Sequence, residues 1–390
     1  MNTTSFTHTL HSEATYLTVQ GHEHLHKSQR VNRVKVLFTF FVPSGGVDTL
    51  NRLRTAVLQR HGIEAHVLYL YPGSGMQNNT STPVFTASSD EEIHSLIHHH
   101  RYDAIIVTSD IAMPGRLRAL GYKGRIIYEA QGLGTREQAM ETIQMGVPYL
   151  QAHCNAAVIP PTDHLLELFI HMCPWLHRFV IPNMLDTNTF APISVDTPPY
   201  PVLAWVGRLE HNKNWREYLM ISSEIIKKIP KARLWFFHDP TLANPEDEVM
   251  FRHMLAEYGL EDRIGIFINV PHSQMPTFYS MVAASGGIML STSLLEGFGY
   301  AVAEAISCGC PVLSTDSDGV RSFITHNRTG KFYPIGNVKT AVSEAVDLMR
   351  NKKLREYIRI QGRQHMAISF SPDRYATSFR EMMTALSIFF

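Results

Sequence analysis

VKVLFTFFVPSGGVDTLNRLRTAVLQRH, residues 34–61, joins an apolar run, a loop with two glycines and a helical pattern. The apolar run Val34–Val42 does not alternate polar and apolar residues, which is typical of a parallel strand buried on both faces. The helical pattern Val47–His61 is stopped by Gly62. A strand followed by a helix in this way predicts the first βα unit of a doubly wound α/β domain.

The same alternation continues outward from this unit. Helical patterns follow at Glu91–His100 and Glu137–His153. Between them the sequence predicts five more strands: Ala65–Tyr71, Tyr102–Thr108, Arg125–Tyr128, Ala156–Pro160 and Phe179–Pro182. We therefore expect an N-terminal Rossmann-like domain over residues 31–195, preceded by a polar, His-rich lead at residues 1–30.

A second α/β series follows a proline-rich linker. Four prolines in the eleven residues of APISVDTPPYP, 191–201, indicate a hinge rather than a helix or strand. The predicted strands beyond it are Val202–Val206, Arg233–His238, Ile264–Val270, Gly287–Ser291 and Pro311–Ser314. We expect a second domain over residues 196–372. Three helices are expected from Asn337 onward, and the last, Pro372–Phe390, is apolar at its end and should pack back on a domain.

Composition excludes several classes of protein. The 390 residues are 44% hydrophobic and 18% charged, which is globular composition and not that of a disordered chain. Lys+Arg and Asp+Glu number 35 each, so a strongly basic nucleic-acid binder is not expected. Four cysteines without a C-x-x-C pair exclude a disulfide scaffold. No signal peptide and no apolar stretch of the roughly 20 residues that a spanning helix needs are seen, so the sequence predicts a cytoplasmic protein.

The first candidate site is the loop that contains Gly45 and Gly46. Glycines let the backbone approach a ligand closely, and the N-terminus of the following helix offers free N–H groups to an anion. An ordinary tight βα turn is the alternative.

The second candidate is the segment Trp205–Asn214, which follows a predicted strand. It places Arg208 and Lys213 at the carboxyl end of that strand. A guanidinium and an ammonium at such a position suit a diphosphate, while the alternative is two solvated surface charges.

The third segment, STSLLEGFGYAVAEA at residues 291–305, is the most specific. Glu296 and Glu304 are eight residues apart, about 12 Å along one helix, so they do not form a close acid–base pair. Gly297 and Gly299 suggest that Glu296 lies in a loop and Glu304 in the first turns of a helix. Each of the two carboxylates could then accept hydrogen bonds from one polyol part of an extended ligand. A phosphate between the two polyols would lie at the helix N-terminus. The alternative is a capping carboxylate and a surface glutamate.

Three other patterns favour structural roles. Gly297-Phe298-Gly299 begins like a dinucleotide fingerprint but has Val302 at the third position. Asp316-Ser317-Asp318 resembles a metal-binding D-x-D but precedes Gly319, where a turn is as well supported. The run His98–His100 is interpreted as a solvated helix end, and no zinc-ligand spacing is found, so no metal site is predicted.

Taken in order, these motifs resemble the family 4 retaining glycosyltransferases of the GT-B fold, the glycosyl transferases group 1, over about residues 33–385. The motifs that carry the resemblance are Gly45-Gly46, V-I-P-N from Val180 with Asp186 and Phe190, V-G-R-L from Val206 with Lys213-Asn214, E-G-F-G from Glu296 with Glu304-Ala305, and Gly309 with Pro311-Val312.

The resemblance implies two Rossmann-like domains around a cleft, with the final helix, 373–390, crossing back to the first. It implies that the nucleotide-sugar donor lies mainly on the second domain and the acceptor mainly on the first. No metal or other cofactor is expected. Transfer is expected to retain the anomeric configuration, with the leaving phosphate acting as base, so no protein nucleophile is named.

The family pattern also assigns roles to residues. Arg208 and Lys213 would hold the donor diphosphate, Glu304 the ribose hydroxyls, and Glu296 would face the donor sugar. The remaining expected contacts are Gly45 and Gly46 over the phosphates, the backbone near Asn269 and Val270 at the base, and the Gly297-Phe298-Gly299 turn.

Two residues depart from the family pattern at positions expected near the donor sugar. Glu129-Ala130-Gln131-Gly132 has Gln131 where many relatives have a histidine, and glutamine cannot carry a proton. Arg321-Ser322 stands where relatives often have a glutamate.

The predicted function is transfer of a hexose-type sugar, from a UDP-sugar in preference to GDP-mannose, to an acceptor hydroxyl. A sugar-nucleotide epimerase and a donor-binding protein that has lost catalysis remain open. The acceptor, whether a glycan, a lipid-linked intermediate, a small metabolite or a protein, also remains open. Apolar residues among 164–178 leave a weak peripheral membrane contact at the inner membrane face as a further possibility, against a packed helix.

Overall fold

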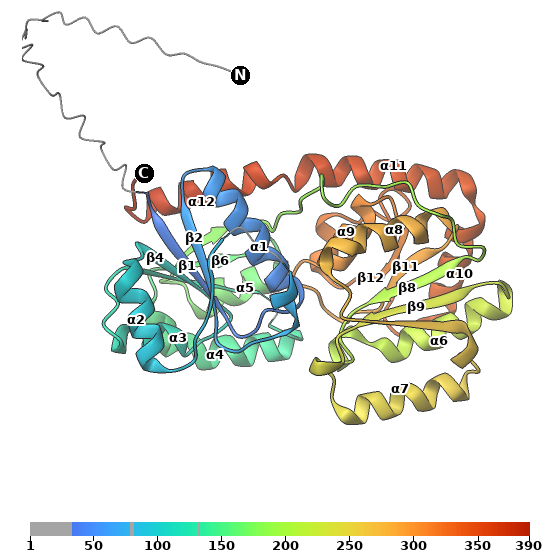
Figure 1. Ribbon diagram of the computed structural model, residues 1–390, viewed down its shortest axis with the longest axis horizontal. Helices are drawn as coiled ribbons and strands as arrows, with labels where there is room; N and C mark the ends of the chain where they lie inside the picture. Colours follow the sequence, from blue (N-terminus) through green and yellow to red (C-terminus); the bar gives the residue numbers. More distant parts are fainter. Residues whose placement is uncertain (1–32, 79–81, 132) are drawn as a thin grey trace, which may run out of the picture. The chain divides into compact units, whose positions relative to one another are not determined.

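The computed structural model describes residues 33–78, 82–131 and 133–390. The predicted lead at residues 1–30, and Gly132 beside Gln131, lie outside these described residues. Within 33–390 the chain builds two parallel β-sheets, which Figure 1 labels strand by strand.

The first sheet has seven strands in the order β3-β2-β1-β4-β5-β6-β7, all paired in parallel. The strands are β1 Lys35–Phe40, β2 Glu64–Tyr69, β3 Val84–Thr86, β4 Ala104–Thr108, β5 Arg125–Glu129, β6 Ala156–Ile159 and β7 His177–Val180. The order reverses between β1 and β4. Ligands of doubly wound sheets bind outside the carboxyl ends of strands at such a switch point. The loop after β1, with Gly45 and Gly46, therefore lies at the switch point of this sheet.

The second sheet has six parallel strands in the order β10-β9-β8-β11-β12-β13. They are β8 Val202–Val206, β9 Arg233–His238, β10 Ile264–Ile268, β11 Ile288–Ser291, β12 Val312–Thr315 and β13 Lys331–Tyr333. The order reverses between β8 and β11. The segments that begin at Gly207 and Thr292 therefore leave the sheet side by side at its switch point.

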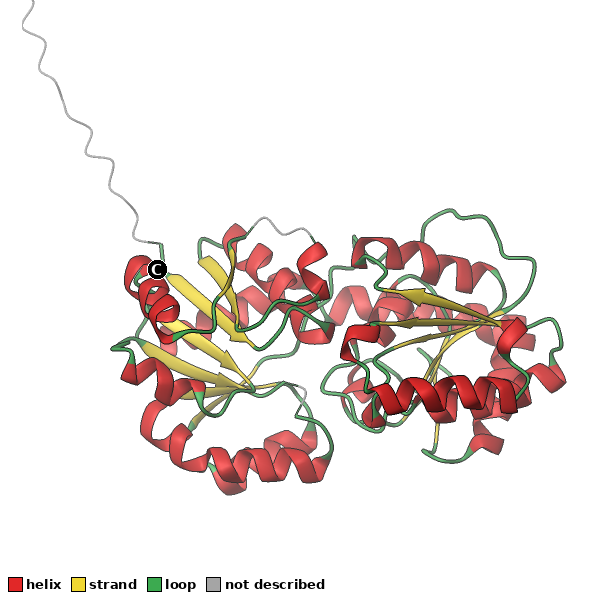
Figure 2. Ribbon diagram, turned by 60° about the horizontal axis from the view of Figure 1, so that its bottom comes forward, coloured by secondary structure: helices red, strands yellow, loops and turns green. Residues whose placement is uncertain are grey.

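Helices cover both faces of each sheet, as Figure 2 shows. The α-helices are α1 Gly45–Arg60, α2 Asp90–His100, α3 Met113–Ala119, α4 Arg136–His153, α5 Asp163–Met172, α6 Trp215–Lys228, α7 Pro245–Glu257, α8 Met275–Ala284, α9 Tyr300–Ser307, α10 Val338–Arg350, α11 Lys352–Ser369 and α12 Pro372–Ala385. Short 3-10 helices are η1 Ser74–Gln77, η2 His211–Lys213, η3 Pro240–Leu242, η4 Glu261–Arg263, η5 His272–Gln274 and η6 Gly319–Ser322. Layers of this kind bury nearly continuous apolar strands on both faces.

The fold class predicted from the sequence is confirmed, with differences at the ends of elements. The edge strands β3 and β13, three residues each, and the short helix α3 were not expected. The last helix ends at Ala385 instead of Phe390. Leu386 and Ile388 pack against the core, but 72% of Phe389 is exposed, so only part of the apolar end is covered.

The last helix, α12, packs on the first sheet although it follows the second along the chain. Its residues Tyr375, Phe379 and Met383 belong to the same core cluster as Val36 and Phe38 of β1. Figure 1 shows α12 beside α1. The exact boundaries at 195/196 and 372/373 remain predictions.

Candidate functional site

Lys213 and Glu296 meet at the switch point of the second sheet. The Nζ of Lys213 lies 2.5 Å from Oε1 of Glu296, and both side chains are largely covered. Asn212 joins the two loops, because its side chain donates to the carbonyl of Leu295 and accepts from that residue's N–H. Thr292 donates to the carbonyl of Lys213 at 2.9 Å. The cation and the carboxylate are therefore positioned by hydrogen bonds between the segments that follow β8 and β11.

Arg208 lies on the same loop but is not drawn into this pair. Its guanidinium is 2.9 Å from Glu210, and 48% of its side chain is exposed. An exposed ion pair of this kind contributes little stability and exchanges partners at little cost. Arg208 therefore remains free to turn toward an anion.

The Glu296 loop is held by the loop after β12. Glu296 N–H donates to Ser317 at 2.8 Å, and its carbonyl accepts from Gly319 N–H at 3.0 Å. A Cβ at Gly319 would lie 2.5 Å from the carbonyl oxygens of both Glu296 and Gly297, so no larger residue fits there without moving this backbone. The two loops are therefore packed backbone against backbone.

The Gly297-Phe298-Gly299 turn leads into α9 and differs from the expectation for Phe298. That side chain is 6% exposed and packs edge-on against the rings of Tyr300 and Phe323. Its ring is part of the core beneath the turn, and only the backbone of the turn is placed to meet a ligand.

Glu304 lies in the second turn of α9 and is buried. Its Oε1 is 2.7 Å from Nε2 of His272, and its Oε2 accepts from the Tyr279 hydroxyl at 3.2 Å. Burial, and then the charge of Glu304, raise the pKa of Tyr279 well above its usual value, so this hydroxyl stays a donor. Glu304 thus has one fixed partner in the core and one, His272, on a surface loop.

His272 also contacts the first half of the chain. Its Nδ1 lies 3.2 Å from Nη1 of Arg52 on α1, and Arg52 is itself held by Asp48 at 3.0 Å. A Cβ at Gly46, at the start of α1, would lie 3.2 Å from the ring of Tyr300. Gly46, at the exposed start of α1, therefore lies against the start of α9.

Asn269 and Val270 lie in the loop after β10. Asn269 has a left-handed backbone (φ 48°), donates to the carbonyl of His238 and accepts from the side chain of Gln77. Val270 packs against the core cluster of the second sheet. The neighbouring η1 loop thus reaches over the carboxyl ends of β9 and β10.

Gln131 belongs to a separate group on the first sheet. It is buried, and its side-chain amide exchanges two hydrogen bonds with that of Asn183, at 2.8 and 3.2 Å. Two residues earlier, Glu129 forms a buried ion pair with Arg54. No described contact joins Gln131 to Lys213 or Glu296.

Asp316 and Asp318 have protein partners. Asp316 pairs with Arg321 at 2.6 Å, and Asp318 makes a buried contact with His164 of α5. Ser322 donates to the carbonyl of Gly319 at 2.7 Å. These contacts support the interpretation of the D-x-D as a turn.

Several residues of this site were not singled out from the sequence, namely Arg52, His272, Tyr279, Arg54 and His164. Only His272 had a local signal, since it follows Asn269-Val270 by two residues at a strand end. Among the described residues, every helix is too short or too polar to cross a lipid bilayer.

Comparison with known proteins shows a similarity to one family of enzymes. Residues 189–365 match the family model of the glycosyl transferases group 1. The 2-deoxystreptamine N-acetyl-D-glucosaminyltransferase of Niallia circulans is 26% identical over 43% of this chain and 41% of that protein. The gpi3 subunit of the phosphatidylinositol N-acetylglucosaminyltransferase of Schizosaccharomyces pombe is 30% identical over 38% of this chain and 31% of that protein. The matched segments thus span less than half of these curated relatives.

The likeness in fold extends further. The crystal structure of Anabaena HepE in complex with UDP-glucose aligns with 90% of this chain and 99% of that chain, at a TM-score of 0.76 and 16% identity. This resemblance covers both sheets. Residues 189–365 are therefore similar to the group 1 glycosyltransferases, in a chain whose two parallel sheets have the GT-B architecture.

Proposed function

We propose that this protein is a retaining, metal-independent glycosyltransferase that moves a hexose-type sugar from a UDP-sugar to an acceptor hydroxyl. The observation that carries the proposal is the Lys213–Glu296 pair at the switch point of the second sheet, inside the segment that matches the family. HepE was solved with UDP-glucose, and the two curated relatives are named N-acetylglucosaminyltransferases, which supports UDP as the donor nucleotide.

The leaving diphosphate would need positive charge, and the site has three sources of it. The ammonium of Lys213 lies at the strand ends, and the half-exposed guanidinium of Arg208 can turn from Glu210. The first N–H groups of α1 and α9 add the positive ends of two helix dipoles. Preorganised charges of this kind stabilise a departing phosphate without a metal ion.

Glu296 would face the donor sugar. Its pairing with Lys213 keeps its oxygens as hydrogen-bond acceptors for sugar hydroxyls and makes it a poor nucleophile. Gln131, already bonded to Asn183, has no group that titrates and cannot act as a general base. These features favour a front-face mechanism in which the leaving phosphate accepts the acceptor's proton.

Glu304 would accept the ribose hydroxyls. Tyr279 holds Oε2 from the core, so Oε1, now bonded to His272, is the oxygen that a ribose hydroxyl would take. His272 is partly exposed on its loop and can move aside. Donor binding would thus exchange one hydrogen bond of Glu304 for another.

The test is incubation of the full-length protein with a panel of radiolabelled nucleotide sugars, with and without excess EDTA. Transfer, or slow hydrolysis of a UDP-sugar that persists in EDTA, supports the proposal. Conversion of the donor without transfer would indicate an epimerase, and tight binding without turnover a non-catalytic donor-binding protein.

Substitutions test whether the activity depends on the residues of this site. Lys213→Met and Glu304→Gln should each impair the reaction, while Lys227→Met should not, because Lys227 is exposed on α6 and pairs only with Glu224. Equal activity in all three variants would exclude the assigned site.

A further inference from the structure

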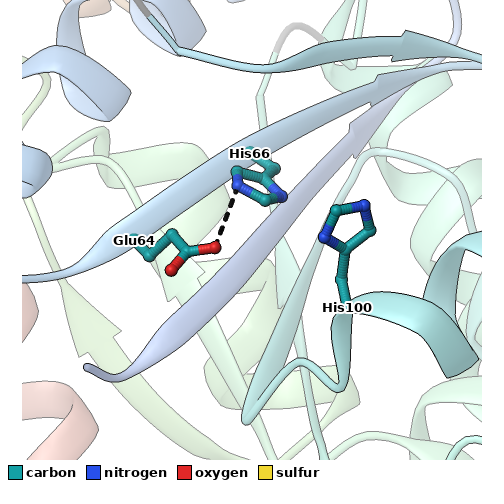
Figure 3. A group of neighbouring side chains, drawn as sticks. All are labelled: Glu64, His66 and His100. Atoms are coloured by element: carbon teal, nitrogen blue, oxygen red, sulfur yellow. Dashed lines mark ion pairs between the residues drawn. The ribbon is translucent and has the colours of Figure 1, made fainter. Parts of the chain in front are cut away.

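Glu64, His66 and His100 form a compact cluster outside the site described above. Glu64 and His66 are two residues apart on β2, so their side chains share one face of the sheet. His100 is the last residue of α2, which covers that face. Figure 3 shows His100 reaching from the helix end toward the ring of His66, with Glu64 beside it on the strand.

The spacing of the three side chains suits one metal ion. One ligand atom from each residue lies within 4.8 Å of the other two. Nε2 of His66 and Oε1 of Glu64 are 3.4 Å apart. Two ligands on a tetrahedral Zn²⁺ are also about 3.4 Å apart, because the bonds are about 2.1 Å long. His100, whose ligand atom lies within 4.8 Å of the other two, would complete the set.

The other ring nitrogen of His66 already has a hydrogen-bond partner. Nδ1 of His66 is 2.9 Å from the hydroxyl of Tyr102, which is buried. A hydrogen bond at this nitrogen fixes the tautomer and turns Nε2 toward a metal. The ring of His100 contacts His66 and Tyr102 but makes no hydrogen bond within the described part of the chain, so it has a nitrogen to offer.

Some features near the cluster favour the binding of a cation, and one nearby charge opposes it. Burial, and then the neighbouring His100, lower the pKa of His66, while burial and then His99 lower the pKa of His100. The negative end of the α2 dipole also favours a cation there. Against this, the ammonium of Lys35 lies 3.0 Å from Oε1 of Glu64 and would have to share or release that oxygen.

We propose that Glu64, His66 and His100 bind a divalent transition-metal ion, Zn²⁺ in the first place, with water at the remaining position. Two imidazoles and one carboxylate are a ligand set that zinc accepts, and imidazole favours zinc over magnesium or calcium. Tyr102 positions His66. The exposed His98 and His99 behave as the solvated face expected from the sequence, whereas His100 turns inward.

The proposed ion would have a structural role. Glu64 begins β2, and His100 precedes the start of β4, so the cluster lies at the amino-terminal edge of the sheet. Gly45 follows β1 at the opposite, carboxyl edge, where the donor site is proposed. The ion would hold the end of α2 against β2 and would take no part in the transfer reaction. This inference does not depend on the proposed function.

The first experiment titrates Co²⁺, as a spectroscopic probe of tetrahedral sites, into the full-length chain and then displaces it with Zn²⁺. Since any histidine side chain is a potential Co²⁺ ligand, all proteins carry asparagine in place of His8, His11, His22, His24 and His26. The reference chain should show one intense d–d band and a raised melting temperature with Zn²⁺. His100→Ala should lose both effects, and Tyr102→Phe should weaken binding about 10- to 100-fold.

The matched control is His98→Ala, on the same helix but outside the cluster. The ring centroids of His94 and His98 lie 4.0 Å apart in a tilted arrangement, and these two residues are the competing pair of ligands. His98→Ala should leave Co²⁺ binding unchanged. Binding that disappears in His98→Ala and persists in His100→Ala would overturn the assignment, as would a reference chain that binds no Co²⁺. Circular dichroism of the metal-free variants separates loss of the site from misfolding.

Discussion

Removing one partner of the buried Arg54–Glu129 ion pair should destabilise the half of the chain that carries the Gly45-Gly46 loop. Arg54 is fully buried on α1, and its Nη1 lies 2.6 and 2.8 Å from the two oxygens of Glu129, at the end of β5. Its guanidinium stacks 3.7 Å above the ring of Phe38. Burial lowers the pKa of Arg54, but Glu129 and Tyr375 together outweigh it and leave that pKa above its usual value, so Arg54 stays charged.

The size of the effect follows from these contacts. Arg54→Met removes charge-assisted hydrogen bonds worth about 1.5–3 kcal/mol and a desolvated cation–π contact worth about 2 kcal/mol. It also leaves Glu129 buried with only Thr108 as a described side-chain donor. We expect a loss of about 3–5 kcal/mol in the free energy of unfolding, with Glu129→Gln near the lower end. The double variant should cost less than the sum of the single ones by about 1–2 kcal/mol, because no isolated charge remains.

The assay is equilibrium unfolding in urea, followed by far-ultraviolet circular dichroism and by tryptophan fluorescence. Three of the four tryptophans, Trp205, Trp215 and Trp235, belong to the second half, so the two signals distinguish the halves. Arg60→Met is the control, because Arg60 is exposed on the same helix. Single variants that each cost under about 1 kcal/mol, or that add without coupling, would refute this account of the pair.

Four further outcomes are expected. Lys213→Met should lower kcat with a UDP-sugar about 100- to 1000-fold, measured in steady state, since it removes one preorganised charge. His272→Ala should tighten UDP binding about tenfold by calorimetry, because Glu304 no longer has to release a partner; unchanged binding would contradict the exchange. Gly319→Ala should cost about 1–3 kcal/mol of stability, because its Cβ would strike backbone oxygens at 2.5 Å. Burial lowers the pKa of His238 in the folded protein, so the unfolded chain binds more protons than the folded one. The free energy of unfolding should therefore fall as pH drops below about 6.5. His238→Gln should reduce that fall, as measured by urea unfolding at a series of pH values.

The sequence predicted the architecture well because buried parallel strands leave a strong local pattern. Runs such as Val202–Val206 and Arg233–His238 match β8 and β9 residue for residue. The missed strands, β3 and β13, are three residues long at the edges of their sheets. A strand that short carries too few residues to show a period, and its pairing is decided by the sheet it joins.

The residues of the candidate site also fall into those that the sequence predicted and those that it did not. The residues predicted from motifs lie in the loops that follow strands or in the first turns of the next helix, where local order along the chain already fixes the edge of the sheet. Their partners come from far along the chain, since 220 residues separate Arg52 from His272 and 75 separate Arg54 from Glu129. No spacing rule connects such positions. The packing role of Phe298 was hidden for the same reason, because Phe323 and Phe370 follow it by dozens of residues.

The contacts of His272 suggest how the two halves of the site depend on each other. Arg52 is held by Asp48 and by Thr49 on its own helix, independently of His272. If a ribose hydroxyl takes the place of His272 on Glu304, the guanidinium of Arg52 keeps its position and loses only that one partner. It would then stand beside an anionic nucleotide with spare N–H donors, which an arginine satisfies best with phosphate. The same event that frees Glu304 thus offers the donor a cation from α1, the helix that begins at Gly45.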